Sequence, residues 1–309
     1  MRILFFGCDD FAAVSLRRLL DDGHAVVGLV TRPDKPKGRG LHVVFSPTKE
    51  IALSRGVEVF QPVTLKDQSV GDKLASFSAD LFVVIAYGLF LPASILKLPR
   101  LFCLNLHASL LPKYRGAAPI NWAIINGERE TGVTLMKMNA AMDAGDILAQ
   151  VRCDIPDNMT SAALRVRLAS LGAEMLSGMI PRIACGDHQL TPQDPQQVTR
   201  APKMHKDMGH IPWTESAQRV HDLVRGVQPW PGAFTFLRGK LLKVLDTAVT
   251  DAPVRGKPGE IVDLHKDGFA VQAGDRAVLI RKVHPANSHP MDARAFLAGH
   301  KLSVGEILG

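Results

Sequence analysis

Two polar side chains, Asn105 and His107, end an apolar run that begins at Leu101. If the run is a β-strand, its side chains alternate between faces, so Asn105 and His107 point to the same side. An amide N–H can donate to a developing oxyanion, and an imidazole that titrates near neutral pH can carry a proton. In open α/β sheets, ligands bind at the carboxyl ends of strands. The pair is a candidate catalytic site, although a polar strand end that simply meets water would show the same short pattern.

A carboxylate that could act with this pair lies in the turn Met142–Asp146. Asp143 is the better candidate of the two aspartates there, because the glycine in the same turn frees the backbone to aim a side chain into a cleft. The alternative is that Asp143 only forms an Asx-turn with its own backbone.

The elements that must position these residues alternate in type along the first half of the chain. Apolar runs typical of buried strands are separated by segments with helical spacing, such as Phe11–Leu20 and Thr160–Ile180. This alternation predicts an α/β fold with a mostly parallel sheet covered on both faces. The first turn, Gly7–Asp10, lacks the G-x-G-x-x-G of dinucleotide sites, so the fold is expected to be Rossmann-like without NAD as ligand.

The amino-acid composition of the chain changes after about residue 188. Prolines, glutamines and few apolar side chains predict an extended linker over residues 189–206. Short strand-like runs broken by glycines and polar turns follow, which indicates a small β-barrel or sandwich. We therefore expect a first domain over residues 1–188 and a second over residues 207–309.

Composition narrows the classes of protein that fit. The 309 residues carry a formal net charge of +7 and have a pI near 9.3, which favours an anionic partner. Four widely spaced cysteines form no zinc-site spacing, so we expect reduced thiols and no metal. No apolar run is long enough to span a bilayer and the first residues do not resemble a targeting segment, so we expect a cytoplasmic protein. A loop rich in Pro and Gly at residues 31–40 holds Arg32, Lys35, Lys37 and Arg39, which suits either phosphate binding or a solvated surface.

Several motifs together give this sequence a resemblance to 10-formyltetrahydrofolate-dependent formyltransferases, and among them to those that act on methionyl-tRNA. The motifs are Phe6-Gly7, Asp10-Phe11-Ala12, Ala86-Tyr87-Gly88, Ser109-Leu110-Leu111-Pro112, Arg115–Ile120, Glu130–Thr134, Met142–Ile147, Pro229-Trp230-Pro231 and Phe296–Gly299. The resemblance covers the whole chain, and the motifs are far more specific together than singly.

The resemblance implies a Rossmann-like formyltransferase domain followed by an OB-like β-barrel. It implies transfer of a formyl group from 10-formyltetrahydrofolate to the α-amine of methionyl initiator tRNA, which supplies formylmethionyl-tRNA for translation initiation. In such enzymes the positions of Asn105, His107 and Asp143 form a catalytic trio, with Asp143 orienting His107 and favouring its charged form. The positions of Ser109, Leu110, Leu111 and Pro112 bind folate. The loop with Arg39, Lys35 and Lys37 enters the tRNA acceptor arm, and a monomer is expected.

Two other functions stay open at this point. The same trio could serve a formyltransferase or hydrolase that acts on a small molecule, or the chain could be an RNA-binding module in which the trio is structural. The sequence also departs from the family's pattern. Pro212 replaces an acidic residue before Trp213, His205 and His210 are unexpected, and residues 285–290 lack the lysines that relatives carry there. These departures concern tRNA contact by the second domain and leave the trio untouched.

Overall fold

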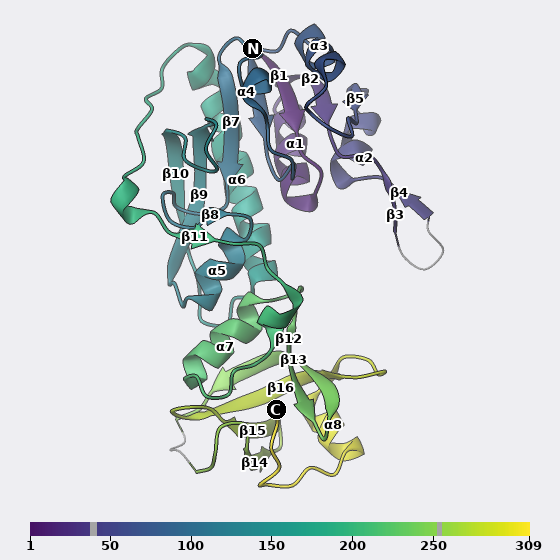
Figure 1. Ribbon diagram of the computed structural model, residues 1–309, viewed down its shortest axis with the longest axis vertical. Coiled ribbons are helices and arrows are strands. Elements are labelled where there is room, and N and C mark those ends of the chain that lie inside the picture. The colour runs from purple at the N-terminus through teal and green to yellow at the C-terminus, as the bar shows by residue number, and fades with distance from the viewer. Residues whose placement is uncertain (38–41, 252–254) are drawn as a thin grey trace. The chain divides into compact units, whose positions relative to one another are not determined.

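The computed structural model describes residues 1–37, 42–251 and 255–309 (Figure 1). The chain forms two compact units. The first comprises Met1–Gly116, Glu130–Asp154 and Arg165–Arg200, and the second comprises Ala117–Arg129, Ile155–Leu164 and Ala201–Gly309. The domain limits expected at residues 188 and 207 stay a prediction. In the structure, two short stretches that precede residue 165 belong to the second unit.

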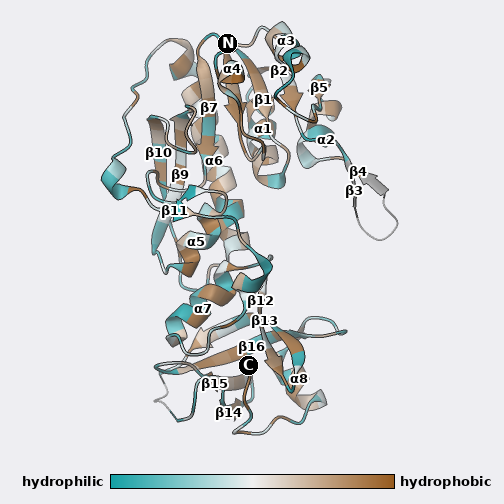
Figure 2. Cartoon of the chain, in the orientation of Figure 1, coloured by the Kyte–Doolittle hydropathy of each residue, from teal (hydrophilic) through white to brown (hydrophobic). Residues whose placement is uncertain are grey.

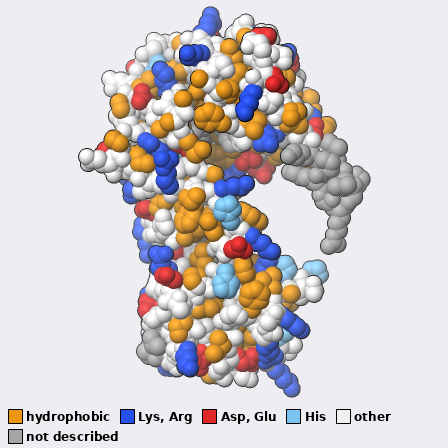
Figure 3. Space-filling view, in the orientation of Figure 1, with side chains coloured by type: hydrophobic (Ala, Val, Ile, Leu, Met, Phe, Trp, Pro, Cys, Tyr) orange, Lys and Arg blue, Asp and Glu red, His pale blue; other side chains and the backbone are white. Residues whose placement is uncertain are grey.

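Apolar and charged residues are separated as burial requires. Figure 2 shows central strands such as β1 and β7 as hydrophobic, and Figure 3 shows charged side chains of both signs spread over the face in view. Among the helices that the structure describes, none has the length and apolar character needed to cross a membrane.

The first unit is built on a seven-stranded sheet, which confirms the expected mostly parallel α/β architecture. In spatial order its strands are β10 (Ile147–Asp154), β9 (Glu130–Lys137), β7 (Phe102–His107), β6 (Leu81–Val84), β1 (Arg2–Phe6), β2 (Ala25–Val30) and β5 (Val59–Phe60). The last five of these run parallel to one another, while β9 and β10 are antiparallel to their neighbours. Because β6, β1 and β7 end side by side, the loops that follow them share one edge of the sheet.

Helices cover the sheet and begin at residues suited to cap them. Asp9 accepts a hydrogen bond from the backbone N–H of Ala12 at the start of α1, and Ser46 does the same for Lys49 at the start of α2. One face of the sheet packs on a cluster that includes Leu74 and Ile95. The helices of this unit are α1 (Asp10–Asp21), α2 (Pro47–Ser54), α3 (Gln68–Ser76), α4 (Ala93–Leu96) and most of α6 (Ser161–Ala184).

Short elements connect these larger ones. They are the hairpin strands β3 (Lys35–Lys37) and β4 (His42–Val44), the strands β8 (Arg115–Gly116) and β11 (Arg200–Ala201), and the 3-10 turns η1 (Pro195–Gln197) and η2 (Lys206–Gly209).

The second unit contains the small barrel expected from the sequence. Its strands are β12 (Ala233–Leu237), β13 (Lys240–Val249), β16 (Ala277–Pro285), β15 (Gly268–Gln272) and β14 (Ile261–His265), with β17 (Met291–Asp292) paired to β16. The C-terminal residues join the two outer strands, because Leu308 bridges Leu237 at the end of β12 and Ile307 bridges Glu260 next to β14. An antiparallel sheet closed in this way has few unpaired edges.

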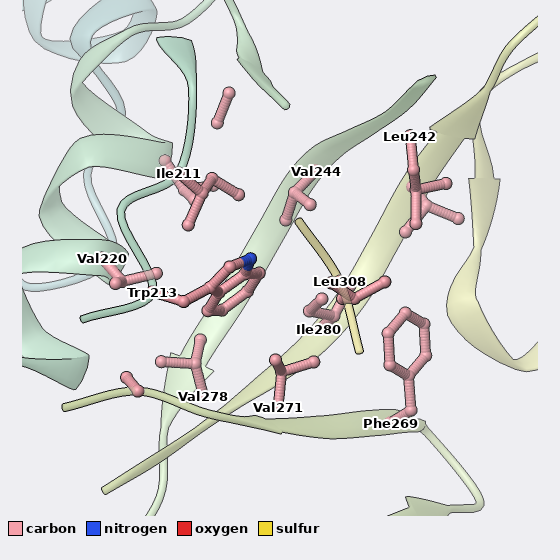
Figure 4. Close-up of a cluster of buried hydrophobic side chains, with 14 of the residues drawn as sticks. Ile211, Trp213, Val220, Leu242, Val244, Phe269, Val271, Val278, Ile280 and Leu308 are labelled. Atoms are coloured by element: carbon pink, nitrogen blue, oxygen red, sulfur yellow. The ribbon is translucent and has the colours of Figure 1, made fainter. Parts of the chain in front are cut away.

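An apolar core fills the barrel (Figure 4). Trp213 lies in this core, and its indole N–H donates to Thr235 Oγ1 at 3.1 Å, so its polar atom is satisfied. The helices of the second unit are α5 (Pro119–Ile125), α7 (Ala217–Gly226) and α8 (Ala293–Gly299).

Candidate active site

Strand β7 places Asn105 and His107 at the edge of the sheet where ligands bind in such folds. It is an interior strand between β6 and β9, so its backbone is held on both sides. Leu106 points to the opposite face, where it contacts α6 at Gly172. The alternation expected from the sequence therefore holds, and the amide and the imidazole leave the same face of the sheet.

The two ring nitrogens of His107 have different partners. Nε2 lies 2.9 Å from the backbone carbonyl oxygen of Tyr114. A carbonyl oxygen only accepts, so Nε2 carries a hydrogen and donates it. Nδ1 lies 3.7 Å from Asp143 Oδ1, and the two side chains are only 7% and 15% exposed. This second contact is an ion pair whenever the ring is protonated.

A tight turn aims Asp143 at His107. Asp143 has a φ of +51°, a conformation that costs a non-glycine residue about 1–3 kcal/mol and needs support from its surroundings. Its Oδ2 accepts a hydrogen bond from the Gly116 backbone N–H at 2.8 Å. Gly145 is required in the same turn, because a Cβ there would lie 1.7 Å from the Lys137 carbonyl oxygen. The carboxylate thus bonds a distant segment rather than only its own turn.

The expected folate segment is a rigid loop directly after β7. Thr134 Oγ1 donates to the Ser109 carbonyl oxygen at 2.6 Å and accepts from the Leu111 N–H at 3.1 Å. The Ser109 hydroxyl donates to the Lys113 carbonyl oxygen at 2.6 Å. Ser109 and Leu111 are buried, whereas Leu110 and Pro112 are half-exposed. Contacts to a ligand are therefore open to Leu110, Pro112 and the loop backbone more than to the Ser109 hydroxyl.

The basic loop is anchored at its base. Lys49 pairs with Asp34, and Gln61 donates to the Arg32 carbonyl oxygen at 2.8 Å. Burial raises the pKa of Asp34, but hydrogen bonds from Lys49 and Gln61 outweigh burial and hold that pKa below its ordinary value. Figure 1 shows the β3–β4 hairpin projecting from the sheet of its unit.

Two of the three cations expected to contact tRNA lie in the described part of this hairpin. Lys35 and Lys37 lie in β3, and Arg39 lies outside the described residues. Their contact with tRNA stays a prediction.

Cys103, a further reactive side chain on β7, belongs to the core of the first unit. Cys103 lies on β7 among buried apolar side chains, and burial raises the pKa of its thiol to about 12, so it is no ready nucleophile. In the part of the chain that the structure describes, no three or more His, Cys, Asp and Glu side chains group so that they could hold a metal ion.

Two residues that the sequence did not single out complete the geometry. Tyr114 supplies the carbonyl oxygen that holds His107. Gln193 lies in the segment expected to be a linker, yet its amide bonds the Asp143 backbone. A sequence does not show which main-chain carbonyl will accept a hydrogen bond from a side chain. A single glutamine in a polar stretch likewise forms no pattern that would indicate a role.

Two family models cover nearly the whole chain. Residues 1–180 match the formyl transferase model, and residues 203–301 match the model of the formyl transferase C-terminal domain. The methionyl-tRNA formyltransferase of Alkaliphilus oremlandii is 42% identical over 309 residues, covering 100% of both chains. That of Acetivibrio thermocellus is 44% identical over 310 residues, again with 100% of both chains covered.

Solved structures agree with this assignment at the level of the fold. A sugar 3N-formyl transferase, WlaRD, has a TM-score of 0.68 at 17% identity, covering 93% of this chain and 98% of its own. HypX from Aquifex aeolicus in complex with tetrahydrofolic acid has a TM-score of 0.64 at 22% identity, covering 99% of this chain and 48% of its own. Because the similarity to these relatives extends over the full length, the chain belongs to the formyl transferase family, among the methionyl-tRNA formyltransferases.

Proposed function

We propose that this chain transfers the formyl group of 10-formyltetrahydrofolate to the α-amino group of methionyl initiator tRNA, and that Asn105, His107 and Asp143 surround the reacting carbon. The observation that carries the proposal is the His107–Asp143 pair at the end of β7, in a chain similar to methionyl-tRNA formyltransferases over its full length. The folate-derived donor supplies the formyl carbon that the amine attacks.

Asn105 is suited to stabilise the charge that develops on the formyl oxygen. It is a half-buried amide on an interior strand, so the backbone that carries this N–H donor is held in place before substrate binds. A fixed donor needs no reorganisation during the reaction, which is why the loss of one such donor commonly costs 10²–10³ in rate.

His107 and Asp143 are suited to manage proton and charge. The attacking nitrogen must lose a proton and the leaving nitrogen must gain one. Because Nε2 is committed to the Tyr114 carbonyl oxygen, Nδ1 is the nitrogen that exchanges a proton. Asp143 Oδ1, 3.7 Å from Nδ1, balances the positive charge of the protonated ring and fixes its orientation.

The binding roles follow from the surrounding loops. The Ser109–Pro112 loop, held by Thr134, gives a folate a preformed surface next to β7. The β3–β4 hairpin carries Lys35 and Lys37, and cations of this kind pair with phosphates of a tRNA acceptor arm.

The test is a transfer assay with 10-formyltetrahydrofolate and methionyl initiator tRNA, run beside methionyl elongator tRNA and a small amino sugar. We expect formylmethionyl-tRNA as product, with the initiator tRNA as the preferred acceptor. Transfer to the amino sugar alone, or to neither tRNA, would overturn the proposal.

A further inference from the structure

Gln193 has every hydrogen-bonding position of its side-chain amide occupied within the first unit. Its Nε2 donates to the backbone carbonyl oxygens of Asp143 at 2.9 Å and Gly145 at 2.7 Å. Its Oε1 accepts from Arg115 Nε at 2.9 Å and Nη2 at 2.7 Å. These partners also fix the amide's orientation, because the flipped amide would set oxygen against oxygen and N–H against N–H. Among residues 191–197, the others are exposed and Gln193 alone is half-buried.

The turn that Gln193 bonds needs support from groups outside the turn. Asp143 occupies a left-handed conformation without being glycine, and such a conformation persists only where neighbouring groups enforce it. The two carbonyl oxygens bonded by Gln193 belong to the aspartate and to the glycine that completes the turn. The amide therefore acts on the backbone that sets the direction of the Asp143 carboxylate.

The segment that contains Gln193 also bonds Tyr114, the residue that holds His107. Thr191 exchanges two backbone hydrogen bonds with Ile147, just after the turn, at 2.8 and 2.9 Å. Thr199 Oγ1 accepts from the Tyr114 N–H at 2.8 Å, and the Tyr114 carbonyl oxygen holds His107. Residues 191–199 thus support both partners of the pair, although their composition is that of a linker.

We propose that Gln193 is a positioning residue for formyl transfer, acting through the Asp143 turn. This inference rests on the proposed function, because it assigns Gln193 an effect only through Asp143. A displacement of about 1 Å in a catalytic group can cost on the order of 10² in rate while substrates still bind. Loss of the amide should therefore lower kcat and leave both KM values nearly unchanged.

The experiment compares Gln193→Leu with Gln196→Leu in the full chain. Gln196 is an exposed glutamine of the same segment, so this control makes the same chemical change away from the turn. We expect Gln193→Leu to lower kcat by about 10- to 100-fold, with each KM within threefold of the parent and an unchanged circular dichroism spectrum. Gln193→Glu keeps the acceptor for Arg115 but loses both donors to the turn, and it should lose at least as much. The proposal fails if either variant keeps kcat within twofold of the parent.

A double-mutant cycle separates positioning from a general loss of structure. If Gln193 acts through Asp143, then adding Gln193→Leu to Asp143→Ala should lower kcat by less than twofold further. A full additional loss in that background would overturn the proposal and leave the proposed function standing. Asp143→Ala with parental kcat would instead remove Asp143 from the proposed function, and the two failures are thus told apart.

Discussion

Asn105 is the member of the trio whose contribution is the easiest to isolate, because its side chain carries no charge and does not titrate. We expect Asn105→Ala to lower kcat for formyl transfer by about 10²–10³-fold, since the donor it removes meets charge only in the transition state. The β7 backbone pairing does not involve the side chain, so folding should be retained. Steady-state kinetics with both substrates would measure the effect.

Asn158→Ala is the matched control, because Asn158 is an exposed asparagine of the second unit. Its kcat should stay within twofold of the parent. If Asn105→Ala raised KM for tRNA and left kcat unchanged, Asn105 would be a binding residue rather than a donor to the oxyanion.

The sequence predicted the side-chain part of the site better than the backbone part. Alternation along β7 put Asn105 and His107 on one face, and the resemblance brought Asp143 to them. The Tyr114 carbonyl and the Gln193 amide were missed, because both act through main-chain groups. Residue types do not reveal which carbonyls will lie close together.

At the scale of the element, α7 takes part in two ion pairs with very different surroundings, one within the helix and one with Glu215 just before it. Asp222 and Arg225 are each 4% exposed at the side chain, with 2.7 Å between Oδ1 and Nη2. Removal of one partner leaves a buried charge uncompensated, which typically costs 3–5 kcal/mol. We therefore expect Asp222→Ala to lower the unfolding free energy of the second unit by about 3–5 kcal/mol.

Glu215→Ala is the control within the same region, because Glu215 and Arg219 are 47% and 63% exposed. Its cost should stay below about 1 kcal/mol. All three tryptophans, Trp122, Trp213 and Trp230, belong to the second unit, so tryptophan fluorescence in a urea titration reports on this unit. Equal costs for the two variants would show that the Asp222–Arg225 pair is solvated in solution.

Elements with strong periodic or capping signals were predictable. The helix expected over Phe11–Leu20 is α1, Asp10–Asp21, and the helix expected over Thr160–Ile180 is α6, Ser161–Ala184. The region read as a linker was harder, because its own composition is polar and the partners of residues 191–199 are spread through the first unit. Long-range hydrogen bonds such as those of Thr191 and Gln193 have no periodicity that a sequence could show.

At the scale of the whole molecule, the net charge of +7 is modest for a protein that meets a polyanion. Basic and acidic side chains are interspersed on the face that Figure 3 shows, so the charge there is not gathered into one patch. Phosphate contacts release counterions, and binding then weakens as a power of the salt concentration. We expect the KM for tRNA to rise linearly with salt on a log–log plot, while the KM for the folate changes little.

The phosphate contacts of the β3–β4 hairpin can be counted from the salt dependence of the KM for tRNA. If Lys35 and Lys37 each meet a phosphate, then replacing either with Gln should reduce the slope of that plot by about one. Lys66→Gln, at an exposed position outside the hairpin, should leave the slope unchanged. Kinetics between 50 and 200 mM salt would measure the slopes of the parent and of the three variants. Equal slopes for all variants would place the phosphate contacts elsewhere on the chain, because a residue that neutralises no phosphate releases no counterion.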